Sequence, residues 1–259
     1  MKTALLVVSF GTTHLDTLEK TIASTERCLA NSFHQYPFYR AFVSGVVRSR
    51  LKKEYGITVD NVEEALAGIA AEGYTHVLLQ PTLLIPGEEL DRLKASVEAA
   101  KGSLRVSIGQ PLLCCDRDLE QILDILQETY PTDPETVLVM MGHGTGHRGN
   151  AIYEQLLQKM RQYETGTMRL TTVEGTPSFE DTIAEVTKLP QRKAVVAPLL
   201  FVAGDHAKND MAGEEEDSLR SLLEAQGFAV TCQLQGLGEI SGVQQMLIQK
   251  ANNAEKELF

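Results

Sequence analysis

The sequence predicts an α/β fold of two similar Rossmann-like lobes, each built on a parallel sheet. Short apolar runs rich in Val, Leu and Ile lack strict alternation, as expected of strands buried on both faces of a parallel sheet. Segments with helical spacing separate these runs, so the pattern is β-α-β-α throughout. A third observation is internal repetition: an apolar run ending in Ser9-Phe10-Gly11 has a counterpart ending in Gly-His143-Gly.

Eight apolar runs are predicted to be strands, four in each half of the chain: 4–9, 39–43, 76–81, 104–109, 136–141, 168–173, 194–201 and 228–234. The segments between them repeat apolar residues every three or four positions, which is typical of helices that cover a sheet. Two helix starts carry a capping signal, at Asp60-Asn-Val-Glu63 and Ser178-Phe-Glu-Asp181. Gly73 and Gly102 stand where left-handed C-terminal caps are needed, and a last helix is predicted from about 241 to 257.

We place the domain boundary at Tyr130-Pro-Thr-Asp-Pro-Glu135, because two prolines interrupt helical geometry just before the second copy begins. The predicted lobes are residues 1–130 and 131–259, each long enough to enclose its own core. Ligands of doubly wound sheets collect outside the carboxyl ends of the strands. The functional site is therefore expected at strand ends, in a cleft between the two lobes.

Aligning the two halves reveals three positions at which only the second half carries a metal-ligating side chain. The aligned pairs are Phe10 with His143, Ser44 with Glu174, and Glu89 with His206. Two neutral imidazoles and one carboxylate suit a borderline divalent ion such as cobalt, nickel, iron or zinc. Three protein ligands also leave coordination positions open for exchange or chemistry. The alignment therefore predicts a reactive metal site.

Each of these residues also has an ordinary interpretation. A single His or Glu in a loop is usually a hydrogen-bonding or solvated residue, but three at corresponding strand ends favour a site. His147 is either a further base or a cap of the following helix. Glu89 is either a base or an acidic residue that stabilises a helix N-terminus.

Composition excludes several classes of function. The formal charge of −11 argues against nucleic acid, which is bound mainly through clustered Lys and Arg. No segment approaches the roughly 20 apolar residues needed to span a bilayer, so no membrane partner is expected. The 4 cysteines form no Cys-x-x-Cys pair and are too few for a disulfide framework, which favours a reducing, cytoplasmic location.

Four motifs spread over nearly the whole chain carry a family resemblance: Leu-Leu-Val-Val-Ser-Phe-Gly-Thr, Met-Gly-His143-Gly, Val-Glu174-Gly and Val-Ala-Gly-Asp-His206-Ala-x-Asn-Asp-Met. Together they resemble the anaerobic cobalt chelatases of cobalamin biosynthesis, which are class II chelatases similar to protoporphyrin ferrochelatase. The resemblance implies two Rossmann-like lobes around a tetrapyrrole cleft and ATP-independent insertion of Co²⁺ into sirohydrochlorin. It assigns the family's two-histidine, one-glutamate metal site to His143, Glu174 and His206, in agreement with the internal alignment.

The resemblance also implies roles for the remaining candidates. His143 is the first choice of base once it is displaced from the metal, with Glu89 or His147 relaying protons. The cleft wall that contacts the macrocycle is expected at the tip of the first strand, at Ser9, Phe10 and Gly11.

The expected partners are sirohydrochlorin and a divalent cation, with homo-oligomerisation left open. No cofactor is expected beyond the substrate Co²⁺, for which Fe²⁺, Ni²⁺ or Zn²⁺ can substitute. Three alternatives remain at this stage: a sirohydrochlorin ferrochelatase, a hydrolase that activates metal-bound water, and a two-lobed metal carrier.

Overall fold

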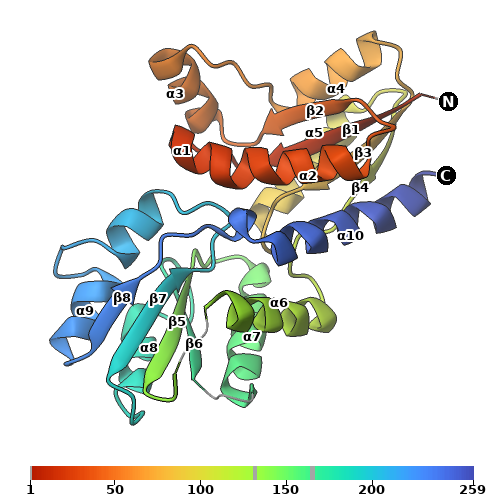
Figure 1. Ribbon diagram of the computed structural model, residues 1–259. Helices are drawn as coiled ribbons and strands as arrows, with labels where there is room; N and C mark the ends of the chain where they lie inside the picture. The colour runs from red at the N-terminus through yellow and green to blue at the C-terminus, as the bar shows by residue number, and fades with distance from the viewer. Residues whose placement is uncertain (1, 131–132, 164–166) are drawn as a thin grey trace. The chain divides into compact units, whose positions relative to one another are not determined.

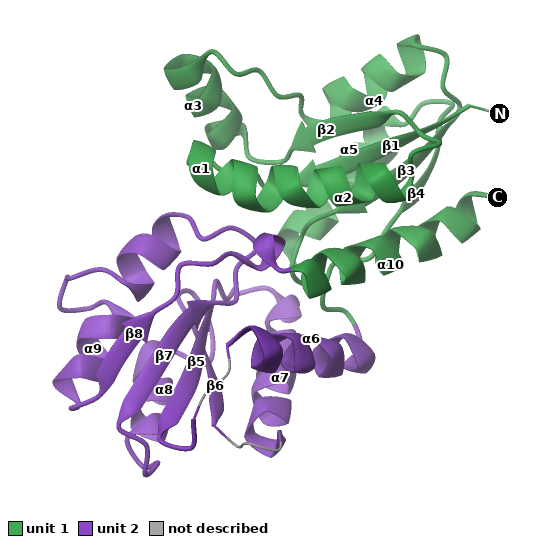
Figure 2. Cartoon of the chain, in the orientation of Figure 1, with its two compact units in different colours: residues 1–114, 241–259 green, residues 115–240 purple. Residues whose placement is uncertain are grey.

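A computed structural model describes residues 2–130, 133–163 and 167–259, which form two compact α/β units (Figures 1 and 2). Unit 1 combines the chain up to Cys114 with Ser241–Phe259, and unit 2 is Cys115–Ile240. Each unit contains a four-stranded parallel sheet, and the order β2-β1-β3-β4 in unit 1 recurs as β6-β5-β7-β8 in unit 2. The predicted fold class and internal duplication are therefore confirmed.

All eight predicted runs form strands. They are β1 (Thr3–Ser9), β2 (Phe38–Phe42), β3 (His76–Pro81), β4 (Arg105–Ile108), β5 (Thr136–Gly142), β6 (Met168–Thr172), β7 (Lys193–Pro198) and β8 (Ala229–Cys232). Every residue of β1 and of β5 is buried, as expected of strands that have neighbours on both sides and helices on both faces. This burial explains why the sequence shows continuous apolar runs instead of alternation.

Helices follow the strands in both units. In unit 1 they are α1 (Leu15–Leu18), η1 (Glu19–Ala23), α2 (Ser24–Ser32), α3 (Gly45–Tyr55), α4 (Val62–Ala71), α5 (Glu88–Ala100) and α10 (Ser241–Leu258). In unit 2 they are α6 (Asp116–Thr129), η2 (Arg148–Asn150), α7 (Ala151–Gln162), α8 (Phe179–Val186), η3 (Ala207–Met211), α9 (Leu219–Ala225) and η4 (Leu237–Glu239). No helix among the described residues is long and apolar enough to cross a membrane.

The helix boundaries follow local chemistry closely. Ser178 forms the predicted capping box at the start of α8, and Gly73 and Gly102 have the positive φ angles of left-handed residues, 79° and 52°. The box at α4 begins one residue later than predicted. Asn61 accepts a hydrogen bond from Glu64 N (2.7 Å), while Asp60 is still paired to β2 through its carbonyl, which accepts from Phe42 N (2.9 Å).

The division into units differs from the predicted boundary between 130 and 131. Helix α6 follows β4 in the chain but belongs to unit 2, where Lys159 of α7 pairs with Asp116 and Glu120 of α6 at 3.0 Å each. Helix α10 follows β8 but belongs to unit 1 (Figure 2). The predicted junction rests on helix-breaking prolines just before the second copy, and two of its residues, 131 and 132, lie outside the described part of the chain.

The apolar face of α10 explains why this helix belongs to unit 1. Its residues Ile248, Ala251, Ala254 and Leu258 pack in one cluster with Leu5, Val7 and Leu78 of the first sheet and with Leu29 and Phe33. The Ser107 hydroxyl also donates to the Ala254 carbonyl (2.7 Å). Periodicity predicts such a helix, but it does not predict which of two similar sheets the helix covers.

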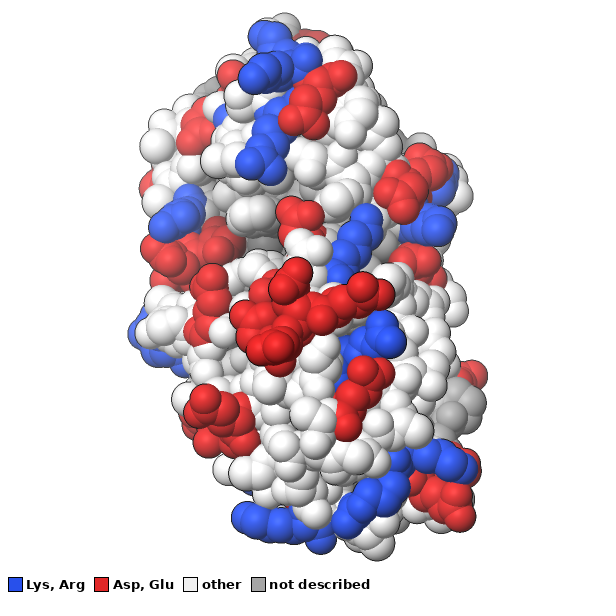
Figure 3. All heavy atoms as spheres, turned by 90° about the vertical axis from the view of Figure 1, so that its left-hand side faces the viewer, with Lys and Arg blue, Asp and Glu red and all other residues white. Residues whose placement is uncertain are grey.

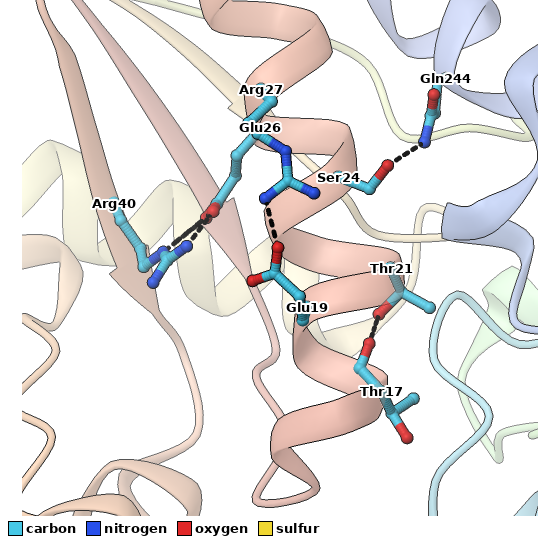
Figure 4. A network of polar contacts seen from close by, with 8 residues as sticks. All are labelled: Thr17, Glu19, Thr21, Ser24, Glu26, Arg27, Arg40 and Gln244. Atoms are coloured by element: carbon cyan, nitrogen blue, oxygen red, sulfur yellow. Dashed lines mark hydrogen bonds and ion pairs between the residues drawn. The ribbon is translucent and has the colours of Figure 1, made fainter.

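One face of unit 1 carries an ion pair between a buried carboxylate and a partly exposed guanidinium (Figure 4). Glu26 of α2 is only 3% exposed, and the guanidinium of Arg40 on β2 donates to both of its carboxylate oxygens, with Nε at 2.8 and 3.0 Å. Burial raises the pKa of Glu26, while Arg40 acts in the opposite direction and lowers it. The nearby pair of Arg27 with Glu19 (2.6 Å) is exposed, at 57% and 65%, so solvent screens it.

Candidate metal site at the carboxyl edge of the second sheet

The three predicted ligands follow three neighbouring strands of unit 2. His143 follows β5 directly, Glu174 lies two residues beyond β6, and His206 immediately precedes η3 in the connection after β7. The β5–β6 ladder continues into the loops, because Glu174 N donates to the His143 carbonyl (2.7 Å). Ser44 N donates to the Phe10 carbonyl in the same way in unit 1 (3.2 Å). This matching bond confirms that His143 and Glu174 occupy the positions of Phe10 and Ser44.

The structure places His143 of unit 2 beside both His206 and Glu174. The His143 and His206 rings have centroids 4.8 Å apart and meet edge to face at 89°, and His143 Nδ1 lies 4.0 Å from Glu174 Oε2. The side chains of His143 and Glu174 are 46% and 64% exposed, which leaves them accessible to an incoming ion.

Hydrogen bonds define which ring nitrogen of each histidine is available to a metal. His206 Nδ1 lies 2.8 Å from Asp210 Oδ2, and His143 Nδ1 lies 3.0 Å from the carbonyl oxygen of Gly144. Carbonyl and carboxylate oxygens only accept, so both Nδ1 atoms carry the hydrogen. In each neutral ring the lone pair is then on Nε2, which is the state of a histidine prepared to bind a metal.

Two glycines allow the ligand-bearing loops to approach each other. Gly144 has a φ of 77°, and a Cβ placed there would lie 2.7 Å from Gly175 N. A Cβ on Gly175 would in turn lie 2.6 Å from Asn150 Oδ1. The loops of His143 and Glu174 therefore touch through their backbones, and any side chain at these two positions would force them apart.

His147 caps η2 at its N-terminus. Its Nδ1 accepts a hydrogen bond from Gly149 N (3.0 Å), so the proton of the neutral ring is on Nε2. Taking a proton at Nδ1 would break this bond. The contact favours the helix-capping interpretation of His147 over that of a base.

The candidates in unit 1 also lie near strand ends. Ser9 is buried, and its hydroxyl oxygen accepts from Thr82 Oγ1 (2.9 Å). Phe10 is 50% exposed, and Gly11 follows it with a φ of 99°. Glu89 is half-buried in the first turn of α5, where an acidic group also stabilises the helix N-terminus. Of these residues, Phe10 presents the large accessible apolar surface.

A run of acidic residues follows η3 in unit 2. All four side chains of Glu214–Asp217 are exposed. Figure 3 shows one face of the molecule, on which Asp and Glu side chains form one larger group and several smaller ones. Exposed carboxylates of this kind raise the local concentration of cations.

Two residues of the site have no counterpart among the sequence-based candidates. Asp210 bonds to His206, and Asn150 bonds to the loops of His143 and Glu174. The four-residue spacing of His206 and Asp210 was a usable signal, because residues four apart on a helix are neighbours. Asn150 had no such signal, since its partner Thr176 is 26 residues away in the sequence.

The duplicated parallel sheets define an α/β protein of two similar units, with His143, Glu174 and His206 as its candidate metal donors. The family model described as cobalt chelatase (CbiK) matches residues 3–256. The chain therefore belongs to the cobalt chelatase family.

Similar proteins agree with this assignment. The sirohydrochlorin cobaltochelatase of Salmonella typhimurium is 36% identical over 98% of this chain and 97% of its own length. The sirohydrochlorin cobaltochelatase CbiKC of Nitratidesulfovibrio vulgaris is 32% identical over 93% of this chain and 86% of its own.

Solved structures share the fold at low sequence identity. SirB from Bacillus subtilis with Fe³⁺ has a TM-score of 0.69 at 15% identity, covering 100% of this chain and 99% of that one. The sirohydrochlorin chelatase SirB in complex with cobalt, from Bacillus subtilis subspecies spizizenii, has a TM-score of 0.64 at 14% identity, covering 99% and 97%. These likenesses support the duplicated α/β architecture.

Proposed function

We propose that this protein inserts Co²⁺ into sirohydrochlorin without ATP, as a lyase of anaerobic cobalamin biosynthesis. The observation that carries the proposal is the pair of histidines with both Nδ1 atoms hydrogen-bonded, beside the Glu174 carboxylate, in a chain of the cobalt chelatase family. Fe²⁺, Ni²⁺ and Zn²⁺ are the competing ions.

In this proposal His143, Glu174 and His206 hold Co²⁺ and then release it to the ring nitrogens of the macrocycle. Their exposure permits the exchange, because the ion is not enclosed by protein. The acidic run Glu214–Asp217 attracts the cation, and Phe10 offers its half-exposed ring as an apolar surface for the macrocycle. Ser9 and Gly11 support that strand tip.

Two protons leave the macrocycle as the metal enters, so the enzyme needs proton acceptors. His143, once released from the metal, has an Nε2 lone pair that can take one proton, because its Nδ1–H is bonded to the Gly144 carbonyl. Glu89 is the proposed second acceptor. His147 serves chiefly as the cap of η2, since its Nδ1 is already engaged.

The proposal is tested by following the visible absorbance of sirohydrochlorin with Co²⁺, with and without the protein. Faster spectral conversion with the protein supports insertion, and repeating the assay with Fe²⁺, Ni²⁺ and Zn²⁺ ranks the metals. No acceleration with any of these ions would contradict a chelatase. Release of product from a hydrolysable ester would instead indicate a hydrolase, and tight Co²⁺ binding without turnover would indicate a carrier.

Replacing Glu89 by glutamine is expected to slow Co²⁺ insertion by about 100-fold, as removal of a general base typically does. The Co²⁺ affinity should remain that of the wild type, because the metal ligands are intact. The rate comes from the absorbance assay and the affinity from isothermal titration calorimetry. Glu88→Gln, in the same first turn of α5, is the matched control. An unchanged rate in Glu89→Gln would remove this residue from the mechanism.

Replacing Asp210 by asparagine is expected to weaken Co²⁺ binding by about 10-fold, because carboxylate partners of metal-binding histidines orient the ring and raise its basicity. The amide retains a hydrogen-bond acceptor for His206 Nδ1–H but loses the charge. Calorimetric titration with Co²⁺ measures the change. Asp205→Asn, in the same loop, controls for the loss of one negative charge. Equal affinities of the two variants would contradict the assigned role.

A further inference from the structure

We infer that Asn150 is a positioning residue that fixes the loop of His143 (residues 143–147) against the loop of Glu174 (residues 173–177). The inference rests on the proposed function, because it assumes that His143 and Glu174 bind the same Co²⁺. Asn150 ends η2 and immediately precedes α7, so its backbone is anchored in helical structure. It is not itself a metal ligand in this assignment.

The side-chain amide of Asn150 connects the two loops with three hydrogen bonds. Its Oδ1 accepts from Thr145 N at 3.1 Å, and its Nδ2 donates to the carbonyl and hydroxyl oxygens of Thr176 at 2.9 and 3.0 Å. A backbone N–H only donates and a carbonyl only accepts, so these partners determine the orientation of the amide. Thr145 is two residues from His143, and Thr176 is two residues from Glu174.

The fit around Asn150 is tight. A Cβ on Gly175 would lie 2.6 Å from Asn150 Oδ1 and 3.0 Å from Thr145 N, so the amide fills the space between the loops. The Thr176 hydroxyl also donates to Glu154 Oε1 (3.1 Å), which connects the second loop to α7. The chain thus holds both loops against the start of one helix.

This arrangement matters because the ligand side chains have little packing of their own. His143 and Glu174 are 46% and 64% exposed, so contacts with neighbouring side chains, such as the His206 ring, fix their positions only in part. The distance between imidazole and carboxylate therefore depends on how the backbone loops are held. Fixing the loops before the ion arrives reduces the conformational entropy lost on binding, which increases affinity.

The test compares Asn150→Ala and Asn150→Asp with the wild type in Co²⁺ titrations and in insertion kinetics. Asn150→Ala is expected to weaken Co²⁺ binding 10- to 100-fold, the range typical of outer-shell partners. The KM for Co²⁺ should rise by a similar factor, while kcat at saturating Co²⁺ changes less. Asn150→Asp keeps the acceptor for Thr145 N and loses the donors to Thr176, so an intermediate affinity is expected.

Asn61→Ala is the matched control, because Asn61 caps α4 of unit 1 and its loss removes a comparable local hydrogen bond. Its melting temperature is expected to fall without any change in Co²⁺ affinity. Wild-type Co²⁺ affinity and KM in Asn150→Ala would overturn the inference. If Asn150→Ala fails to fold, Asn150→Asp decides the question, and wild-type affinity in that variant would also overturn it. His143→Ala separates the two proposals: undiminished Co²⁺ binding in that variant would refute the proposed metal site itself.

Discussion

Replacing His206 by alanine is expected to weaken Co²⁺ binding and to slow Co²⁺ insertion by at least about 100-fold. Removing an outer-shell partner of a metal ligand lowers metal affinity by up to about 100-fold, and removing the ligand itself is expected to lower it at least as much. The His206 ring lies edge to face against His143 with its Nδ1–H held by Asp210, so its Nε2 has no substitute in the variant. Co²⁺ titration and the sirohydrochlorin absorbance assay measure the two effects.

His34→Ala is the control for the loss of one imidazole, because His34 is exposed in the turn after α2. That variant should bind Co²⁺ and insert it at wild-type levels. Because the His206 side chain is 40% exposed, its removal should lower the melting temperature only slightly. Full insertion activity in His206→Ala would contradict the assignment of the metal site, although not the membership in the chelatase family.

Replacing Arg40 by methionine is expected to lower the free energy of unfolding of unit 1 by about 3 kcal/mol at neutral pH. Glu26, at 3% exposure, would be left without its guanidinium partner, and the contact of Arg40 with the Phe42 ring (5.9 Å) would also be lost. Urea unfolding measures the change. Arg27→Met is the matched control (Figure 4), since its exposed pair with Glu19 is worth at most about 1 kcal/mol.

The cost of Arg40→Met should depend on pH in a defined direction. Burial raises the pKa of Glu26 above its ordinary value of 4.5, and removing Arg40 raises it further, because Arg40 lowers it in the wild type. A carboxyl whose pKa is higher in the folded than in the unfolded protein favours folding at pH values below its unfolded-state pKa. This contribution is lost as the pH rises through the folded-state pKa. The deficit of the variant should therefore be small below pH 4.5 and grow towards neutrality. A deficit independent of pH would show that lost packing, not charge, is responsible.

The sequence by itself determined the repeated architecture and named the candidate metal ligands. Continuous apolar runs predict buried parallel strands because the side chains on both faces of such strands are covered. The repeat then located His143, Glu174 and His206, since equivalent strand ends meet at one edge of a sheet and a substitution there changes the chemistry. Local capping signals also appear in the sequence, as at Ser178, because they involve residues only three apart.

Only the tertiary structure decided which surfaces each element covers and which atoms orient the candidate ligands. The placement of α10 on unit 1 and of α6 in unit 2 depends on packing between segments distant in the chain. The bonds of Asn150 to Thr145 and Thr176 likewise join separate loops. Periodicity and motifs reflect residues that are close together in the sequence. These contacts instead join segments that are far apart in the sequence and come together only in the folded chain.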